Sequence, residues 1–256
     1  AWLLLGVGAD VLDGIWSKDG GTERPWKWVA VRFVGPGTAP GPPMPAAGFV
    51  SRLRAGEPQH LLFYGTSLTS SSCSGFWVSY VCKALEEAVP GLVRHSNEAK
   101  ESVSSGWALE SLRERVVAAA PDALFLEFAV NDALLKYRLS PAACRRNICF
   151  ILDCVRKELP RCECVLMTTN PCLHEHAEWR PRLPEYYQVY REVAWERGLL
   201  LVDLHSDWLR ILVQDPTAFQ GFVPDGLHPS SSGCASVVAP AVLAALGLPG
   251  VVGGGR

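Results

Sequence analysis

Three residues that lie far apart in the sequence, Ser67, Asp225 and His228, have the types needed for nucleophilic catalysis. A serine hydroxyl becomes a nucleophile when a neighbouring base takes its proton, and histidine can act as that base. The imidazole must be held in one tautomer, which an adjacent carboxylate achieves. Asp225 precedes His228 by three residues, so in a turn its carboxylate can reach the near ring nitrogen. These residues predict serine-centred acyl transfer.

Acyl transfer also needs hydrogen-bond donors for the oxyanion of the tetrahedral intermediate. The backbone N–H groups of Ser67 and Gly106 and the side-chain amide of Asn131 could supply three of them. Gly106 has no Cβ, so its backbone can approach a substrate closely. Each stretch also has a structural interpretation, because Asn131-Asp132 and Asp225-Gly226 are common turn dipeptides and hydroxyl residues often follow strands. The combination at successive strand exits favours the functional interpretation.

Short apolar runs alternate with longer segments of helical spacing from residue 59 onward, and these must position the site. The predicted strands are Leu61–Tyr64, Leu92–His95, Ala123–Val130, Cys164–Thr168 and Leu199–Leu204. Ser140-Pro141 is a helix start signal, and Gly198 is suited to a helix end. Continuous apolar strands that alternate with helices predict a parallel sheet covered on both faces. Such sheets bind ligands beyond the carboxyl ends of their strands.

Four sequence blocks resemble those of the SGNH (GDSL-type) hydrolase superfamily over about residues 59–247. The blocks are Gly65-Thr66-Ser67-Leu68-Thr69, Gly106, Asn131-Asp132 and Asp225-Gly226-Leu227-His228. The resemblance implies an α/β fold, namely a three-layer α/β/α sandwich on a flavodoxin-like sheet of five parallel strands. It also implies metal-independent ester hydrolysis without a cofactor.

Carried over residue by residue, the resemblance assigns Ser67 as nucleophile, His228 as base and Asp225 as the group that orients the base. Ser67, Gly106 and Asn131 would then form the oxyanion hole. The sequence departs from the family pattern at Thr66, where Asp is usual, and at Ala129, where Gly is frequent. Neither change removes a catalytic group.

The expected substrate is a small acyl ester, most of all an O-acetyl group on a carbohydrate. A lipid or thioester hydrolase, an acyltransferase and a non-catalytic carbohydrate-binding module on the same fold are the alternatives. The residues considered for the substrate pocket are Thr66, Trp107, Asp132, His174 and Trp179. Cys172, His174 and His176 alternate in a loop and could bind a metal, but their spacing is not typical of a metal site, and we expect none.

The chain has 256 residues, of which 48% are hydrophobic, and a net charge of −2. This near-neutral balance favours neither nucleic acid nor an anionic membrane as partner, and no apolar run reaches the roughly 20 residues of a membrane span. The predicted organisation is an N-terminal extension over 1–58, irregular or β and with a strand near Trp26–Phe33, a catalytic domain over 59–248 and a flexible tail over 249–256. Nine cysteines without a pairing pattern favour a reducing compartment, although export after removal of a leader stays open.

Overall fold

The computed structural model describes residues 13–17, 27–31 and 48–248. Strands β1 (Asp13–Ser17) and β2 (Lys27–Val31) pair antiparallel, and β2 falls within the strand predicted near Trp26–Phe33. The predicted tail, 249–256, lies outside the described residues. No helix in the described ranges is long and apolar enough to cross a membrane.

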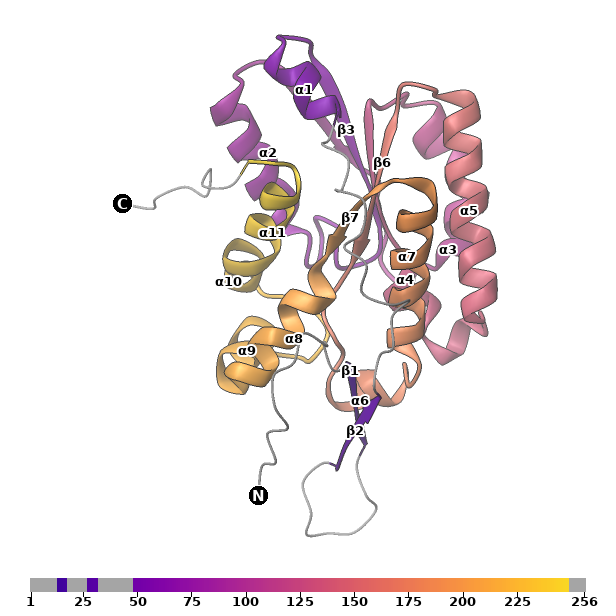
Figure 1. Ribbon diagram of the computed structural model, residues 1–256, viewed down its shortest axis with the longest axis vertical. Coiled ribbons are helices and arrows are strands. Elements are labelled where there is room, and N and C mark those ends of the chain that lie inside the picture. The colour runs from indigo at the N-terminus through magenta and orange to yellow at the C-terminus, as the bar shows by residue number, and fades with distance from the viewer. Residues whose placement is uncertain (1–12, 18–26, 32–47, 249–256) are drawn as a thin grey trace.

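A sheet of five parallel strands forms the centre of the molecule, which confirms the predicted fold (Figure 1). Its strands are β3 (Gln59–Gly65), β4 (Val93–Asn97), β5 (Ala123–Glu127), β6 (Glu163–Thr168) and β7 (Leu200–Asp203). They lie in the order β4-β3-β5-β6-β7, the flavodoxin-like order. The direction of winding reverses between β3 and β5, so a crevice for a ligand is expected beyond the carboxyl ends of these two strands.

Strand β5 is shorter than the sequence predicted, because the chain begins a helical turn at its end. The N–H groups of Asn131 and Asp132 both donate to the carbonyl of Phe128, at 3.0 Å each. This turn forms α4 (Ala129–Asp132) and replaces the last residues of the predicted strand Ala123–Val130. The early end places Asn131 on a short helix at the sheet edge.

Helices cover both faces of the sheet (Figure 1). One face is covered by α1 (Gly48–Arg54), α2 (Phe76–Ala88), α8 (Leu204–Gln214), α9 (Pro216–Phe222), α10 (Ser231–Gly233), the π-helical turn η3 (Cys234–Val238) and α11 (Ala239–Ala245). The other face is covered by α3 (Ser105–Leu112) with the π-helical turn η1 (Arg113–Val117), α4, α5 (Pro141–Glu158) and α7 (Leu183–Arg197). The 3-10 turn η2 (Leu135–Tyr137) and α6 (His174–Glu178) lie in connections at the carboxyl edge.

The helix ends follow local sequence signals. The Ser140 side chain accepts a hydrogen bond from the N–H of Ala143, and Pro141 begins α5. Helix α7 ends at Gly198, whose φ of 60° is in the left-handed region that glycine tolerates. Pro240 stands in the first turn of α11, where its missing N–H costs no helical hydrogen bond.

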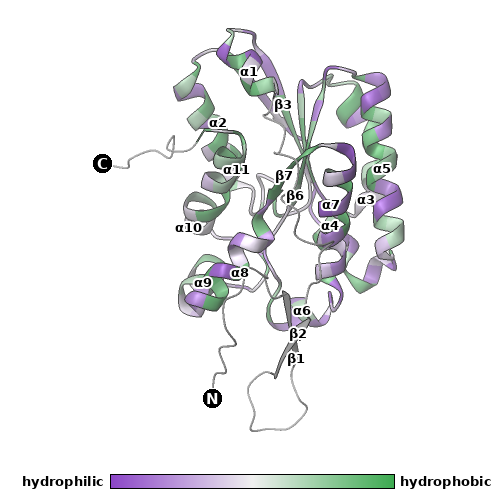
Figure 2. Cartoon of the chain, viewed as in Figure 1, coloured by the Kyte–Doolittle hydropathy of each residue, from purple (hydrophilic) through white to green (hydrophobic). Residues whose placement is uncertain are grey.

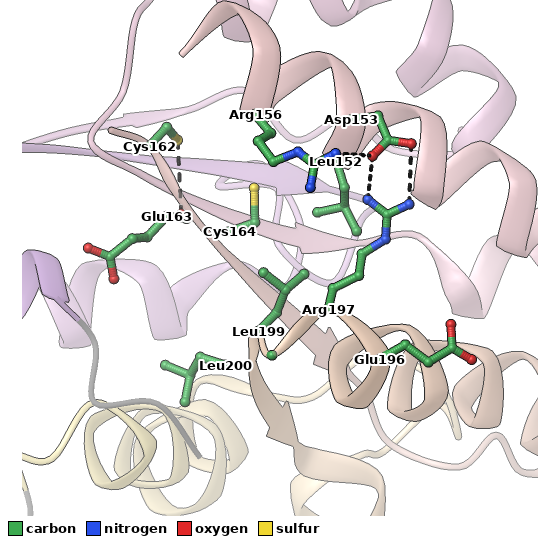
Figure 3. A pocket seen from close by; sticks show the side chains of 11 residues that line it. Leu152, Asp153, Arg156, Cys162, Glu163, Cys164, Glu196, Arg197, Leu199 and Leu200 are labelled. Carbon is green, nitrogen blue, oxygen red and sulfur yellow. Dashed lines mark hydrogen bonds and ion pairs between the residues drawn. The ribbon is translucent and has the colours of Figure 1, made fainter. Parts of the chain in front are cut away.

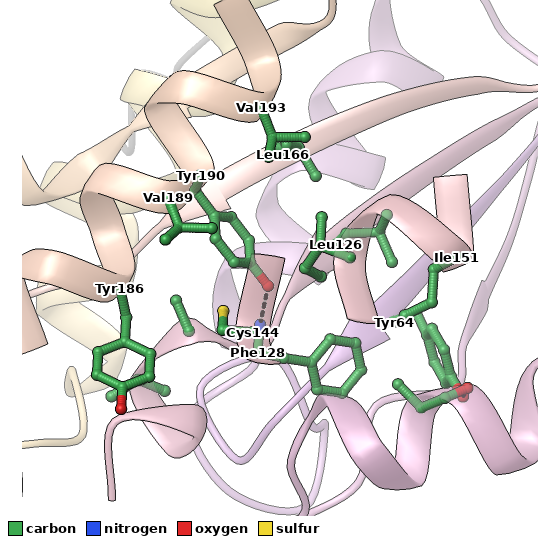
Figure 4. Close-up of a cluster of buried hydrophobic side chains, with 14 of the residues drawn as sticks. Tyr64, Leu126, Phe128, Cys144, Ile151, Leu166, Tyr186, Val189, Tyr190 and Val193 are labelled. Carbon is green, nitrogen blue, oxygen red and sulfur yellow. Dashed lines mark hydrogen bonds between the residues drawn. The ribbon is translucent and has the colours of Figure 1, made fainter. Parts of the chain in front are cut away.

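Two apolar cores lie on opposite faces of the sheet because side chains alternate along each strand. On β3, Leu61 and Phe63 face one core, whereas Leu62 and Tyr64 face the other. Figure 4 shows the second core, where the Tyr190 hydroxyl accepts a hydrogen bond from the N–H of Phe128 at 3.0 Å. Figure 2 shows the matching pattern, with green strands and with α5 and α7 coloured in alternating green and purple. Burial of each large apolar side chain contributes about 1.5–3 kcal/mol.

Helix α1 lies within the predicted N-terminal extension, yet it packs into the first core. Phe49 is fully buried, and its ring lies edge-on to Phe125 with centroids 6.2 Å apart. The N–H of Gly48 donates to the Glu163 carboxylate at 2.7 Å, and Arg52 forms an ion pair with the same carboxylate at 2.8 Å. The packed body therefore begins by Gly48, ahead of the boundary predicted at residue 59.

Candidate active site

Ser67, Asp225 and His228 meet beyond the carboxyl end of β3, although Ser67 and His228 are 161 residues apart in sequence. The Ser67 Oγ lies 3.0 Å from His228 Nε2. On the other side of the imidazole, Nδ1 lies 2.7 Å from Asp225 Oδ2. This chain of hydrogen bonds can move a proton from the serine to the histidine while the carboxylate holds the ring.

The Asp225 carboxylate is held in its charged form by the turn that contains it. Its Oδ1 accepts hydrogen bonds from the N–H groups of Leu227, at 2.8 Å, and His228, at 2.7 Å. Burial alone would raise the pKa of Asp225, but these bonds and the imidazole outweigh burial and lower it. A charged Asp225 favours a proton on Nδ1 of His228, which leaves Nε2 free to accept the Ser67 proton.

The loop that carries Ser67 is held by hydrogen bonds to the carboxylate of Glu127, the last residue of β5. Glu127 accepts hydrogen bonds from the Thr66 N–H at 3.1 Å, from the Thr66 hydroxyl at 2.9 and 3.0 Å, and from the Thr69 hydroxyl at 2.9 Å. Burial raises the pKa of Glu127 to about 7. A Cβ at position 65 would lie 2.8 Å from Glu127 Oε1. The close packing of the Glu127 carboxylate against the backbone of β3 therefore requires glycine at position 65.

Thr66 and Asp132, two of the residues considered for the substrate pocket, form hydrogen bonds to other parts of the protein. Both are fully buried. The Thr66 hydroxyl is directed to Glu127, and Asp132 Oδ1 accepts a hydrogen bond from the Ser105 N–H at 2.7 Å. Burial raises the pKa of Asp132, while the hydrogen bonds from Ser105 oppose the rise. Neither side chain is free to contact an ester.

Asn131 lies in α4 and Gly106 in α3, and both helices begin at the carboxyl edge of the sheet. The Asn131 side-chain amide donates to the Val103 carbonyl at 2.9 Å, which connects α4 to the segment before α3. Gly106 is the second residue of α3, and N–H groups in the first turn of a helix lack intrahelical acceptors. A Cβ on Gly106 would meet only Ser104 Oγ at 3.4 Å, an ordinary contact. Packing within the protein therefore does not explain this glycine.

Two further residues contact the candidate site: Asn170, which the sequence did not single out, and Arg180, which the sequence suggested only as a neighbour of a pocket wall. The Asn170 amide donates to the Leu227 carbonyl at 2.9 Å and so fastens the turn that carries His228. Arg180 is buried, and its guanidinium donates to Asn131 Oδ1 at 3.3 Å. Both lie in loop sequence with no recognisable pattern, and their contacts join distant parts of the chain. Glu127 did carry a signal, because it is a lone carboxylate in an apolar strand.

Helix α6 lies beside His228. The His176 ring lies 6.4 Å from the His228 ring, and the Trp179 ring lies 5.3 Å from His176. His174 is close to the same turn, because a Cβ on Gly226 would come within 3.0 Å of the His174 ring. Trp179 is 45% exposed, so one aromatic surface beside the site is open to solvent.

Trp107 lies at a different wall of the site. Its ring packs against Tyr64 at 5.5 Å, with the Lys100 ammonium 5.5 Å and the Arg115 guanidinium 5.3 Å from its centroid. It is half-buried by these neighbours.

The Cys172, His174 and His176 stretch does not form a metal-binding group in the described part of the chain. Burial raises the pKa of Cys172 to about 12, so its thiol stays protonated at neutral pH.

A cavity of about 630 Å³ lies at the opposite, amino edge of the sheet (Figure 3). It is lined by the starts of β6 and β7 and by the ends of α5 and α7, with Asp153, Arg156 and Arg197 among its side chains. Asp153 pairs with Arg197 at 2.6 Å and with Arg156 at 3.6 Å. None of the predicted site residues lines this cavity.

The chain matches the sequence profile of the GDSL-like lipase/acylhydrolase family over residues 63–235, more than half of its length. This chain belongs to that family. It is accordingly a carboxylic ester hydrolase. No curated protein matches it in sequence.

Solved structures of low identity share the fold. A putative GDSL-like lipase from Parabacteroides merdae is 18% identical, with a TM-score of 0.65 over 75% of this chain and 97% of that one. A catalytic mutant of Axe2, an acetylxylan esterase from Geobacillus stearothermophilus, is 21% identical, with a TM-score of 0.63 over 78% and 98%. The lipase/acylhydrolase from Enterococcus faecalis is 21% identical, with a TM-score of 0.63 over 73% and 94%.

Proposed function

We propose that this ester hydrolase works through a covalent acyl-enzyme on Ser67, with His228 as general base and Asp225 as its orienting carboxylate. The observation that carries the proposal is the pair of hydrogen bonds, 3.0 Å and 2.7 Å, that joins the three side chains across the length of the domain. A serine in a turn has no structural need for such partners.

In the first half of the reaction, Ser67 Oγ attacks the ester carbonyl carbon and its proton passes to His228 Nε2. The tetrahedral oxyanion would be stabilised by the N–H groups of Ser67 and Gly106 and by the Asn131 amide. The intermediate collapses, His228 returns the proton to the leaving alkoxide, and the alcohol departs. In the second half, His228 takes a proton from water as the water oxygen attacks the carbonyl carbon of the acyl-Ser67. The second tetrahedral intermediate collapses, the bond to Ser67 Oγ breaks, His228 returns the proton to Ser67 Oγ and the acid departs.

The substrate class that we propose is a small acyl ester, most of all an O-acetyl group on a carbohydrate. The open aromatic surface of Trp179 beside His176 supports this choice, because an exposed indole can stack on a sugar ring. An acetylxylan esterase with the same fold gives further support. Hydrolysis of a lipid or thioester is the second candidate. A binding-only role is separated from catalysis by the assay below, and acyl transfer to an acceptor other than water is the third candidate.

The test is hydrolysis of p-nitrophenyl acetate by the wild type and by Ser67→Ala. We expect turnover in the wild type and a loss of at least about 10³-fold in the variant, because the nucleophile is gone. Equal rates would remove Ser67 from the mechanism. A panel of acetylated sugars and medium-chain esters then tests the substrate class, and a preference for medium chains would overturn the carbohydrate proposal.

A further inference from the structure

Arg180 is a buried cation at the edge of the candidate site that has no carboxylate partner among the described residues. Its side chain is 5% exposed. Its three nitrogen groups donate to oxygens that carry no net charge: Nε to the Val130 carbonyl at 2.8 Å, Nη1 to the His176 carbonyl at 3.4 Å, and Nη2 to Asn131 Oδ1 at 3.3 Å. A buried charge is costly unless it is paired, so a fold rarely retains one without a use for it.

The contacts of Asn131 show where this charge could act. Its carboxamide is held at both ends, because Oδ1 accepts from Arg180 and Nδ2 donates to the Val103 carbonyl. With both ends occupied, the amide cannot flip, and one Nδ2 hydrogen remains for another acceptor. A cation on Oδ1 draws electron density from the amide nitrogen, so the remaining N–H becomes a stronger donor.

We propose that Arg180 is a positioning residue that fixes and polarises the Asn131 amide as an oxyanion donor. The inference rests on the proposed function, since it requires an oxyanion at this site. Arg180 contacts two consecutive residues of α4, Val130 and Asn131, and this sets the angle at which the amide leaves the helix. Its effect grows as negative charge develops, so it favours the transition state over the bound ester.

A purely structural role would give a different pattern. Through the His176 carbonyl, Arg180 also contacts α6, which contains His176 and is followed directly by Trp179. If Arg180 only held α6 in place, its loss would disturb the wall of the site and raise KM. It would also lower activity by the same factor whether or not Asn131 is present.

The test is a double-mutant cycle on p-nitrophenyl acetate hydrolysis with Arg180→Met, Asn131→Ala and the double variant. We expect Arg180→Met to lower kcat by about 10–100-fold, less than the full loss of an oxyanion donor, with KM within about twofold. In the Asn131→Ala background, the same substitution should change kcat by less than about threefold. Multiplicative effects, or a change confined to KM, would overturn the proposal.

Two further variants keep the test decisive. Arg182→Met removes a nearby exposed arginine that pairs with Glu185, and it should leave kcat unchanged. Arg180→Lys keeps the charge but not the planar fork, and it serves if Arg180→Met does not fold. With Asn131 present, Arg180→Lys should have a lower kcat than the wild type. In the Asn131→Ala background, the same substitution should leave kcat unchanged relative to Asn131→Ala alone. If the wild type is active, Ser67→Ala is inactive and the Arg180 variants keep the wild-type kcat, the proposed role of Arg180 is wrong. The proposed function of Ser67 would then still stand.

Discussion

The two edges of the sheet differ in whether their charged side chains are buried and whether they are paired. The amino edge has a cavity of about 630 Å³, and the charged side chains around it, such as Asp153 and Arg197, pair with one another at the surface. At the carboxyl edge, Glu127, Asp132 and Arg180 are buried without a partner of opposite charge among the described residues. Buried charges are expensive, and their concentration at one edge marks the chemistry better than volume does.

The largest expected effect at the carboxyl edge comes from Asp225→Asn. An amide there favours the wrong tautomer of His228, so kcat should fall by about 10⁴-fold while the fold is retained. Steady-state kinetics on p-nitrophenyl acetate measure this. Asp153→Asn is the matched change at the amino edge and should leave kcat unchanged. A fall of less than about tenfold in Asp225→Asn would show that the carboxylate does not orient the base.

Asn131→Ala should lower kcat by about 10²–10³-fold, because one oxyanion donor is lost. Circular dichroism and denaturant unfolding should show a folded protein. Undiminished turnover would remove Asn131 from the oxyanion hole and leave Ser67 and Gly106 as its only proposed donors.

Glu127 should make the free energy of unfolding depend on pH. Its pKa is about 7 in the folded protein, chiefly because of burial, against about 4.3 in an unfolded chain. The unfolded chain therefore loses the proton first, and stability declines as the pH rises from about 4.3 to 7. The decline is on the order of 3 kcal/mol and should be absent in Glu127→Gln. Urea unfolding at pH 5 and pH 8 measures it. Parallel pH dependence in the two proteins would show that the Glu127 pKa is not raised.

The smallest effect is expected at the amino edge. Asp153→Ala removes the pair with Arg197, and both side chains are partly exposed, at 52% and 26%. Such pairs contribute about 0–1 kcal/mol, so the free energy of unfolding should fall by no more than that. Activity should not change. A loss of turnover would mean that the two edges are coupled.

The sequence predicted those parts of the molecule that depend on local patterns. Four of the five strands follow apolar runs, whereas β4 is mostly polar. Ser67, Asn131, Asp225 and His228 stand at strand exits or in short blocks whose spacing is readable. The sequence does not indicate that β5 ends at Glu127, because Phe128-Ala129-Val130 looks like a continuing apolar strand. Helix α1 was missed because only its packing against Phe125 shows that it belongs to the core. Arg180 and Asn170 act through contacts between distant segments, which no local pattern indicates.

The most direct test of the central proposal is covalent labelling with an alkyl fluorophosphonate, which phosphonylates an activated serine hydroxyl. Tandem mass spectrometry of the labelled protein locates the modified residue. We expect one equivalent on Ser67, no labelling in Ser67→Ala and much slower labelling when His228 is replaced by Ala. A label on another serine, or labelling of Ser67 that does not depend on His228, would contradict the proposed mechanism.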